Sequence, residues 1–535
     1  MPHYGRLRLF EDRIFIIKTC RQEVFNSEIM PIFANDLESG AKPALHLIIY
    51  NMSTLKEKTA QGLLWGSMSN GVQQLLNLLI GIFLARMLSQ TDYGMVGMVT
   101  IFTALGATLQ EGGFISALNK LREATYRDFN SVFWTSLGIG VSFYLLLFVC
   151  APLIASFYDE PELTALTRYV SLSFVISSLT TAPRAFMFRN MMVRETSIMT
   201  IVSLAVSGIV AIIMAWCGMA YWGIATQNLV YILLIAILSY RFTGWRPSMD
   251  IDFGPVRKML GFSSRLIITN VFSIINNNVF AVILGKLYIA SDVGNYTQAN
   301  KWNTMGSSLI SNMIGGVAQP VFRQVDDDAA RRKAVLRKML RFTALVTFPL
   351  MLGLALVAKE FIVILITEKW LESATIMQML CVAGAFAPIS WLFSNLIISR
   401  GHSSRYMWST ILQCLAGLAL ALLMAPRGIH AMVGAYVVVA VLWTVVWQRL
   451  AHKETGLRVM EFLRDISPYL LLSAILCIMA HFVAGGIANI YLRFLAKVVL
   501  VAVPYVGILW MLGSTILHEG INYIIKRTPT GNAQK

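Results

Sequence analysis

The sequence predicts an all-α polytopic membrane protein with about fourteen transmembrane helices, arranged as two six-helix lobes plus two further helices at the C-terminus. Its composition is the first observation behind this prediction. Of 535 residues, 56% are hydrophobic and 13% are charged, and the mean hydropathy is +0.64. A water-soluble fold of this length cannot bury so much apolar surface. The other two observations are a duplicated sequence element and the placement of Lys and Arg in alternate loops.

The duplicated element reads LARMLSQTDYG at 84–94 and LGKLYIASDVG at 284–294, an offset of 200 residues. Six apolar segments separate the copies, and an even number brings both into the membrane from the same side. The predicted lobes are therefore related by a parallel pseudo-two-fold axis along the membrane normal, as in transporters built from two bundles. The offset aligns these pairs: Asn70 with Asn270, Asn77 with Asn277, Arg86 with Lys286, Asp92 with Asp292, and Gly94 with Gly294.

A span needs about 20 predominantly apolar residues. The segments that meet this length, in chain order, are 62–85, 93–116, 131–156, 165–186, 197–218, 220–240, 260–287, 294–319, 341–358, 372–398, 406–425, 429–449, 466–487 and 491–513. The first six form the predicted N-lobe (60–245) and the next six the C-lobe (259–451), separated by a polar linker with Pro247 and Pro255. The last two spans (463–513) are an appendix without a third copy of the element.

Four other segments are not predicted to span. Residues 1–51 form an N-terminal extension without a signal-peptide pattern, so we expect a disordered tail or a true start at Met52. Residues 514–535 are a predicted cytoplasmic tail. The segment 359–370 is too short and too charged to span, which places it at the interface. The basic run at 331–341 is most simply a solvated cytoplasmic helix beside anionic lipid.

The distribution of Lys and Arg predicts orientation. With the N-terminus inside, the even-numbered loops are basic, and the outside loops are short and poor in Lys and Arg. Both termini are then cytoplasmic in a multi-pass membrane protein. The net charge of +16 reflects these loops, since no basic-aromatic nucleic-acid module is present.

Catalytic patterns are missing from the sequence. It contains no nucleophile–base pair, metal cluster, Walker motif or GxGxxG element, and its six cysteines are scattered without metal spacing or a disulfide framework. We therefore predict no enzyme activity, no cofactor and no metal, with H⁺ or Na⁺ coupling left open.

Polar residues inside spans tend to face a bundle interior or a wet cavity. The aligned spans 1 and 7 each carry such residues at i, i+3 and i+7, on one helical face. The predicted cavity residues are Asn70, Gln73, Asn77, Asn270, Ser273 and Asn277. Hydrogen bonding between helices within each lobe is the alternative. Lys301, inside span 8, is the candidate to meet a phosphate, against local pairing with a carboxylate.

The charged residues of the duplicated element allow two interpretations. Arg86 and Lys286 are either snorkelling bases that, with the capping acids Asp92 and Asp292, fix a turn, or a cationic rim that attracts an anionic substrate. The duplication of these residues favours the structural interpretation, since both lobes need the same turn. Glu111 is a candidate coupling site for a cation or proton, although Gly112 and Gly113 suggest close packing there.

The chain resembles the polysaccharide transporter family, in particular its colanic-acid-exporter-like (Wzx-type) flippases. The motifs that carry the resemblance, over about 60–513, are LARMLSQTDYGMVGM, LQEGGFISALNK, FYDEPELTALTRYVSLSFVISSL and APRAFMFRNMMVR, then LGKLYIASDVGNYTQANKWN, GGVAQPVFRQVDDD and TEKW. The resemblance implies the two-lobed fold of the multidrug/oligosaccharidyl-lipid/polysaccharide exporter superfamily. It also implies a substrate, undecaprenyl-pyrophosphate-linked oligosaccharide, moved by alternating access for O-antigen, capsule or exopolysaccharide synthesis.

Implied partners are this lipid-linked oligosaccharide, membrane lipids, and the polysaccharide polymerase and chain-length machinery. Alternatives remain. A cation-coupled multidrug antiporter of the same fold should carry an acid deep in span 1 or 7, and neither does. EGGF at 111–114 is similar to an element of lipid II flippases, but the Arg those proteins carry just before it is missing. A polymerase-like glycosyltransferase needs a large outside loop, and every outside loop here is short. A non-transporting scaffold is the third alternative, but the polar stripes duplicated in both lobes favour a cavity.

Overall fold

The computed structural model describes residues 65–513 except 67, 112–113, 122–123 and 325–327. The chain divides into two compact units, Met1–Met68 and Ser69–Lys535. Nearly all of the first unit lies outside the described residues, as does the tail at 514–535. The extension at 1–51, its proposed start at Met52, and the tail therefore stay predictions. The description below concerns the second unit.

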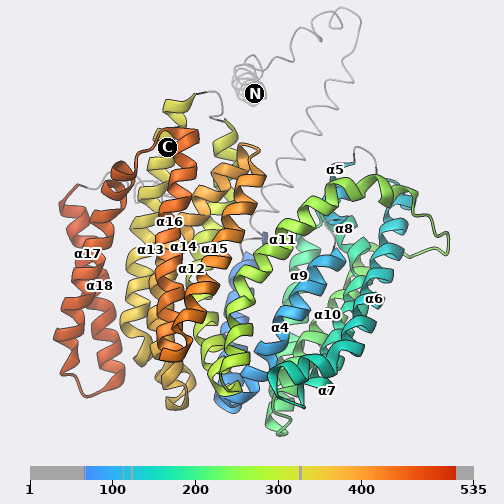
Figure 1. The fold of residues 1–535 in the computed structure, drawn as a ribbon, viewed down its shortest axis with the longest axis horizontal. Helices are drawn as coiled ribbons and strands as arrows, with labels where there is room; N and C mark the ends of the chain where they lie inside the picture. The colour runs from blue at the N-terminus through green and yellow to red at the C-terminus, as the bar shows by residue number, and fades with distance from the viewer. Residues whose placement is uncertain (1–64, 67, 112–113, 122–123, 325–327, 514–535) are drawn as a thin grey trace, which may run out of the picture. The chain divides into compact units, whose positions relative to one another are not determined.

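The described regular structure is entirely helical, which confirms the predicted all-α class (Figure 1). The first candidate span is Met68–Met87. Up to the linker, the helices that follow it are α4 (Gln90–Glu111), α5 (Phe114–Lys120), α6 (Tyr126–Tyr158), α7 (Leu163–Ser178), α8 (Thr181–Arg189), α9 (Val193–Trp216) and α10 (Trp222–Thr243).

The second half repeats this order of helices and adds two at its end. Its elements are α11 (Gly254–Leu287), α12 (Ala290–Gln324), α13 (Ala329–Ile366), η1 (Glu368–Trp370), α14 (Leu371–Ser399), α15 (Ser403–Met424), η2 (Ala425–Arg427), α16 (Ile429–Thr455), α17 (Val459–Gly485) and α18 (Ile490–Met511). The segment 359–370 is not a separate interfacial piece, because α13 continues through it to Ile366.

All fourteen predicted spans coincide with a helix or a helix pair. Eleven of the described helices are long and apolar enough to cross a membrane, or twelve with α7 and α8, which are bent by 45° at their junction. The helices α11 and α12 do not meet this test. The polar residues Asn295 and Gln298 lower the mean hydropathy of α12. Both side chains are buried, so they do not face lipid. The count of fourteen therefore stays a prediction.

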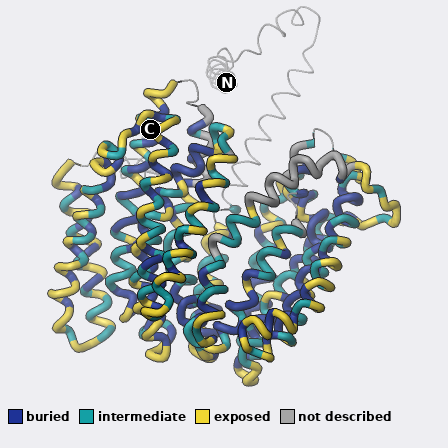
Figure 2. Tube along the Cα trace, viewed as in Figure 1, coloured by how far each residue is buried: buried dark blue, intermediate teal, exposed yellow. Residues whose placement is uncertain are grey.

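Burial follows the pattern of a bundle in lipid. Figure 2 shows exposed residues concentrated on outer helices such as α17 and α18, where Phe482 and Val503 present apolar side chains. By contrast, α14 is largely buried, and its buried side chains include Leu392 and Phe393. Exposed apolar residues on the periphery and buried ones at the centre are consistent with a hydrocarbon surround.

The boundary between the lobes is less simple than the predicted ranges. The long helix α11 contacts α4, α5 and α6 of the first repeat as well as α12 and α15 of the second. It is therefore shared between the two halves, and the lobe limits 60–245 and 259–451 stay predictions.

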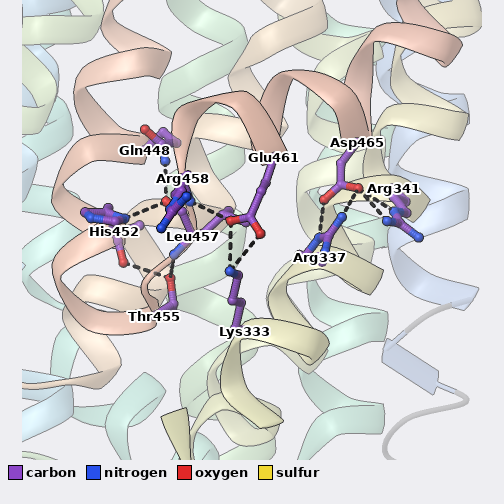
Figure 3. A network of polar contacts seen from close by, with 11 residues as sticks. Lys333, Arg337, Arg341, Gln448, His452, Thr455, Leu457, Arg458, Glu461 and Asp465 are labelled. Carbon is purple, nitrogen blue, oxygen red and sulfur yellow. Dashed lines mark hydrogen bonds and ion pairs between the residues drawn. The ribbon is translucent and has the colours of Figure 1, made fainter. Parts of the chain in front are cut away.

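The appended helix α17 is fixed to α13 by ion pairs (Figure 3). Asp465, whose carboxylate is 1% exposed, accepts hydrogen bonds from Arg337 and Arg341, with Nε–O distances of 2.6 and 2.7 Å. Lys333 pairs with Glu461 at 2.8 Å. The basic run at 331–341 is thus the beginning of α13, and three of its cations bind α17 rather than only solvent or lipid. A second pair, Lys497 with Glu360 at 2.6 Å, joins α18 to α13 in a buried position.

Candidate functional site

The two copies of the duplicated element meet each other. An ideal Cβ built on Gly94 would lie 1.8 Å from the carbonyl oxygen of Ala290, and one built on Gly294 would lie 1.8 Å from that of Gln90. Residues 90 and 290 correspond in the repeat, so the two contacts are equivalent. Helices α4 and α12 therefore cross at their first turns with a separation that admits only glycine.

Arg86 crosses from the first repeat to the second. Its Nε donates to the carbonyl of Leu365 at 2.7 Å and its Nη2 to that of Ile364 at 2.9 Å. These carbonyls belong to the last turn of α13, where helix carbonyls lack intrahelical partners and carry partial negative charge. Arg86 therefore caps a helix of the other repeat.

The segment after α13 returns the contact. Lys369 Nζ donates to the carbonyls of Arg86 at 2.9 Å and Leu88 at 2.7 Å. The fully buried Trp370 donates from Nε1 to the carbonyl of Ala85 at 2.8 Å and packs edge-on against Tyr93. The first copy of the element is thereby enclosed by residues 364–370.

Lys286 makes the matching connection in the opposite direction. Its Nζ lies 2.9 Å from Asp159 Oδ2 and 5.4 Å from the centre of the Phe157 ring. Asp159 is the C-cap of α6 and adopts φ 59°, as Thr367 after α13 adopts φ 86°. Each duplicated cation thus reaches the C-terminal end of the third helix of the other repeat.

We call this set of contacts the outer closure, because the predicted orientation places it at the outer face. Its residues are Arg86, Gly94, Asp159, Lys286, Gly294, Lys369 and Trp370. The two acids of the element lie in its turns. Asp92 accepts hydrogen bonds from the backbone and hydroxyl of Ser89 at 2.8 and 2.7 Å, and Asp292 has a backbone hydrogen bond to Ile289.

Lys301 lies at the interface between the repeats. An ideal Cβ on Gly81, in the first span, would lie 2.7 Å from Lys301 Nζ. Asn77 is one turn from Gly81 and on the same face, which it shares with Asn70. Both asparagines are exposed in the structure. Among the described residues, none forms a hydrogen bond or ion pair with the Lys301 ammonium. The structure therefore brings Lys301 to the polar face of the first span.

The remaining predicted residues are not gathered there. Gln73 donates to Ser69 Oγ at 2.8 Å along its own helix. In the second stripe, Asn270 is exposed and Ser273 is half-buried, whereas the side chain of Asn277 lies outside the described residues. The same holds for the side chain of Glu111, the last residue of α4. Within the described part of the chain, no group of three or more His, Cys, Asp or Glu residues could hold a metal ion.

The sequence reasoning missed Asp159, Lys369 and Trp370 as closure residues. A signal for them was available. DEPEL at 159–163 and TEKWL at 367–371 both follow the third helix of a repeat, at an offset of 208 residues. The repeat therefore continues beyond the duplicated element, and this later segment lies beside the residues that each duplicated cation contacts.

Comparisons with known proteins agree with this architecture. A model of the family described as polysaccharide biosynthesis protein matches residues 83–375. The lipopolysaccharide biosynthesis protein WzxC of Escherichia coli (strain K12) is 24% identical over 356 residues, covering 65% of this chain and 71% of that protein. The teichuronic acid biosynthesis protein TuaB of Bacillus subtilis (strain 168) is 23% identical over 440 residues, covering 80% of this chain and 89% of that protein.

Two solved structures share the fold of this chain. The lipid II flippase MurJ in an inward closed conformation aligns with a TM-score of 0.70 at 14% identity, covering 86% of this chain and 100% of that one. An inward-facing multidrug resistance MATE family transporter of the MOP superfamily aligns with a TM-score of 0.52 at 14% identity, covering 72% and 94%. These matches confirm the predicted resemblance and the polytopic fold class.

Proposed function

Because the chain belongs to the polysaccharide biosynthesis protein family and shares its fold with a lipid II flippase, we propose that it flips a lipid-linked oligosaccharide across the bacterial inner membrane. The multi-pass membrane architecture fits this role. In the proposed reaction, an oligosaccharide on undecaprenyl pyrophosphate moves from the cytoplasmic to the outer leaflet for surface polysaccharide synthesis. The polymerase that extends the glycan is its proposed downstream partner.

The observation that carries the proposal is the position of Lys301. An ammonium inside a membrane bundle is costly unless it is paired, and Lys301 has no anionic partner among the described residues. It lies against the helix face that carries Asn70 and Asn77. A phosphate would pair with this cation, while the asparagine amides offer the neutral donors and acceptors that sugar hydroxyls need.

The proposed mechanism is alternating access, in which the two repeats rock about the path between them. The outer closure supports this proposal, since its contacts come from residues near one end of the helices of each repeat, with η1 beside them. Breaking its contacts would open the outer end. An inside-negative potential of 100 mV favours outward movement of each negative charge by about 2.3 kcal/mol. Coupling to H⁺ or Na⁺, with Glu111 as the candidate site, is a further element of the proposal.

The test is deletion of the gene followed by complementation. We expect the deletion strain to accumulate lipid-linked oligosaccharide on the cytoplasmic leaflet and the wild-type gene to restore export. Lys301→Gln should lower export about tenfold or more, the effect of losing one charge-assisted contact. Lys453→Gln, at an exposed position at the end of α16, is the matched control and should export normally.

Other outcomes would favour a different function. Normal surface polysaccharide in the deletion strain, together with increased drug sensitivity, would replace the proposal with a multidrug antiporter of this fold. Loss of viability with accumulated lipid II would identify a peptidoglycan precursor as the substrate. Normal export by Lys301→Gln, with wild-type protein levels in the membrane, would give Lys301 a structural role.

A further inference from the structure

A second polar site lies within the first repeat, away from Lys301. A cavity of about 410 Å³ is enclosed by α4, α7, α8, α9 and α10. Within the described residues, its lining includes none from the Met68–Met87 helix or from the second repeat. Its volume falls in the range of small-molecule sites, about 300–1,000 Å³.

Hydroxyl groups line much of this cavity. Seven Ser and Thr residues contribute, together with the amide of Asn228 and the phenol of Tyr231. Several of the hydroxyls donate to a carbonyl three or four residues earlier in the chain: Thr100 to Val96, Thr180 to Ser177 and Thr200 to Thr196, at 2.7–2.8 Å. A hydroxyl that donates in this way keeps its lone pairs. The wall is therefore rich in acceptors for a ligand with many O–H groups.

A larger cavity in the described part of the chain is lined differently. That cavity, about 660 Å³ between α12, α13 and α18, is lined almost wholly by apolar side chains. Its one charged lining residue, Lys497, is paired with Glu360. Hydroxyl lining thus distinguishes the first-repeat cavity from this larger one.

One cation borders the hydroxyl-lined cavity, and the fold fixes its position. Arg184 lies on α8, which departs from α7 by 45°. Tyr240 of α10 donates to the carbonyl of Leu179 at this bend, at 2.9 Å. The hydroxyls of Ser136 and Thr181 lie 2.8 Å apart and join α8 to α6. Arg184 is exposed, so its guanidinium is accessible to a ligand at the cavity.

We propose that this cavity binds the sugar–pyrophosphate head of the lipid-linked substrate, with the Arg184 guanidinium on the phosphate and the hydroxyl wall on the first sugar. The inference rests on the proposed function and names a binding site for it. A planar guanidinium can hold two phosphate oxygens at once, which a lysine cannot. The positive-inside distribution places α8 toward the cytoplasm, so the site meets the substrate before Lys301 does.

A binding experiment tests the site without relying on export. In proteoliposomes of a variant with its native cysteines replaced, Ala104→Cys places one thiol in the cavity wall. The probe is undecaprenyl pyrophosphate, with undecaprenol as the control that lacks phosphate. We expect the pyrophosphate to slow maleimide labelling of this thiol about fivefold or more, and undecaprenol to leave the rate unchanged. Adding Arg184→Ala should remove the protection, and Arg184→Lys should restore part of it.

Equal protection by undecaprenol, no protection at all, or protection that survives Arg184→Ala would overturn the inference. Export provides the second readout. Arg184→Ala and Asn228→Ala should each lower it about tenfold. Arg241→Ala, an exposed arginine at the end of α10 that does not line the cavity, should not. If the wild-type gene restores export and both cavity variants export normally, the site is wrong and the proposed function stands. If wild type itself exports no glycan, the proposed function is wrong.

Discussion

At the scale of single residues, the two glycines of the duplicated element decide how closely the repeats approach. Gly94 and Gly294 each leave room for a carbonyl of the other repeat where any side chain would collide. The sequence predicted that these residues correspond, but it could not predict that they touch. Contact between positions 200 residues apart depends on how the helices cross, which no local pattern encodes.

Gly94→Ala should loosen the outer closure. The added methyl would overlap the Ala290 carbonyl, and overpacking of this kind costs about 1–3 kcal/mol, more where backbone is the obstacle. We expect a lower apparent melting temperature in detergent. Gly138→Ala is the matched control, because an ideal Cβ there has no neighbour within 4 Å. This control should be neutral or slightly stabilising, since alanine favours a helix over glycine by up to about 1 kcal/mol. Equal melting of both variants would contradict the crossing contact.

Spacing predicted the polar face of the first span, and the structure places Lys301 beside it. The acceptors of Arg86 could not be predicted in the same way. They are main-chain carbonyls 278 and 279 residues distant, and a carbonyl carries no residue-type signal. The hydroxyl-lined cavity was missed for a related reason. Its Ser and Thr residues are spread over several helices, where single hydroxyls usually bond to their own backbone.

At the scale of elements, the ion pairs of Asp465 explain how the appended helices stay on the second repeat. Composition predicted α17 and α18 as spans, and both are candidate spans in the structure. Their attachment was not predicted, because the basic run at 331–341 is equally typical of a lipid-facing surface. Only the fold shows that Asp465 lies between Arg337 and Arg341.

Asp465→Ala should therefore release α17 from α13. The substitution removes the acceptor of two arginines, and breaking such a pair costs about 1–3 kcal/mol here, below the range for full burial because Arg337 and Arg341 are 30% and 41% exposed. Faster amide hydrogen exchange in α17, with unchanged exchange in α9, is the expected measurement. Glu461→Gln, which weakens the more exposed pair with Lys333, is the control and should have a smaller effect. A larger effect from Glu461→Gln would reverse the assignment.

At the scale of the whole molecule, the outer closure is similar in its two halves but unequal in strength. Arg86 donates to two carbonyls at the end of α13, and Lys369 and Trp370 add contacts beside it. Lys286 has one carboxylate, Asp159, which is 80% exposed, and exposed ion pairs contribute little. The half of the closure around Arg86 should dominate the equilibrium between closed and open outer ends.

Arg86→Ala should thus open the outer end more than Lys286→Ala does. Hydrogen bonds to a charged group contribute about 1.5–3 kcal/mol, so the open population should rise about tenfold or more for Arg86→Ala. Spin labels at Met219 and Arg427, in the predicted outside loops of the two repeats, would report the change as a longer distance by double electron–electron resonance. Arg241→Ala, at the opposite end of α10, is the control and should leave the distances unchanged. The order of the two closure variants is the critical result: a greater shift for Lys286→Ala would be inconsistent with the structure.

The reciprocal contacts of Gly94 with Ala290 and of Gly294 with Gln90 have the form of an interface between identical subunits, in which residue i of one copy meets residue j of the other and the reverse. A half-length chain carrying this element once could have made the same crossing as a homodimer. In such an ancestor, one substitution would have changed both contacts at once. In the single chain, each contact is made by its own residues, and Arg86 binds main-chain acceptors whereas Lys286 binds an acid. Single substitutions can therefore change the two halves of the outer closure independently.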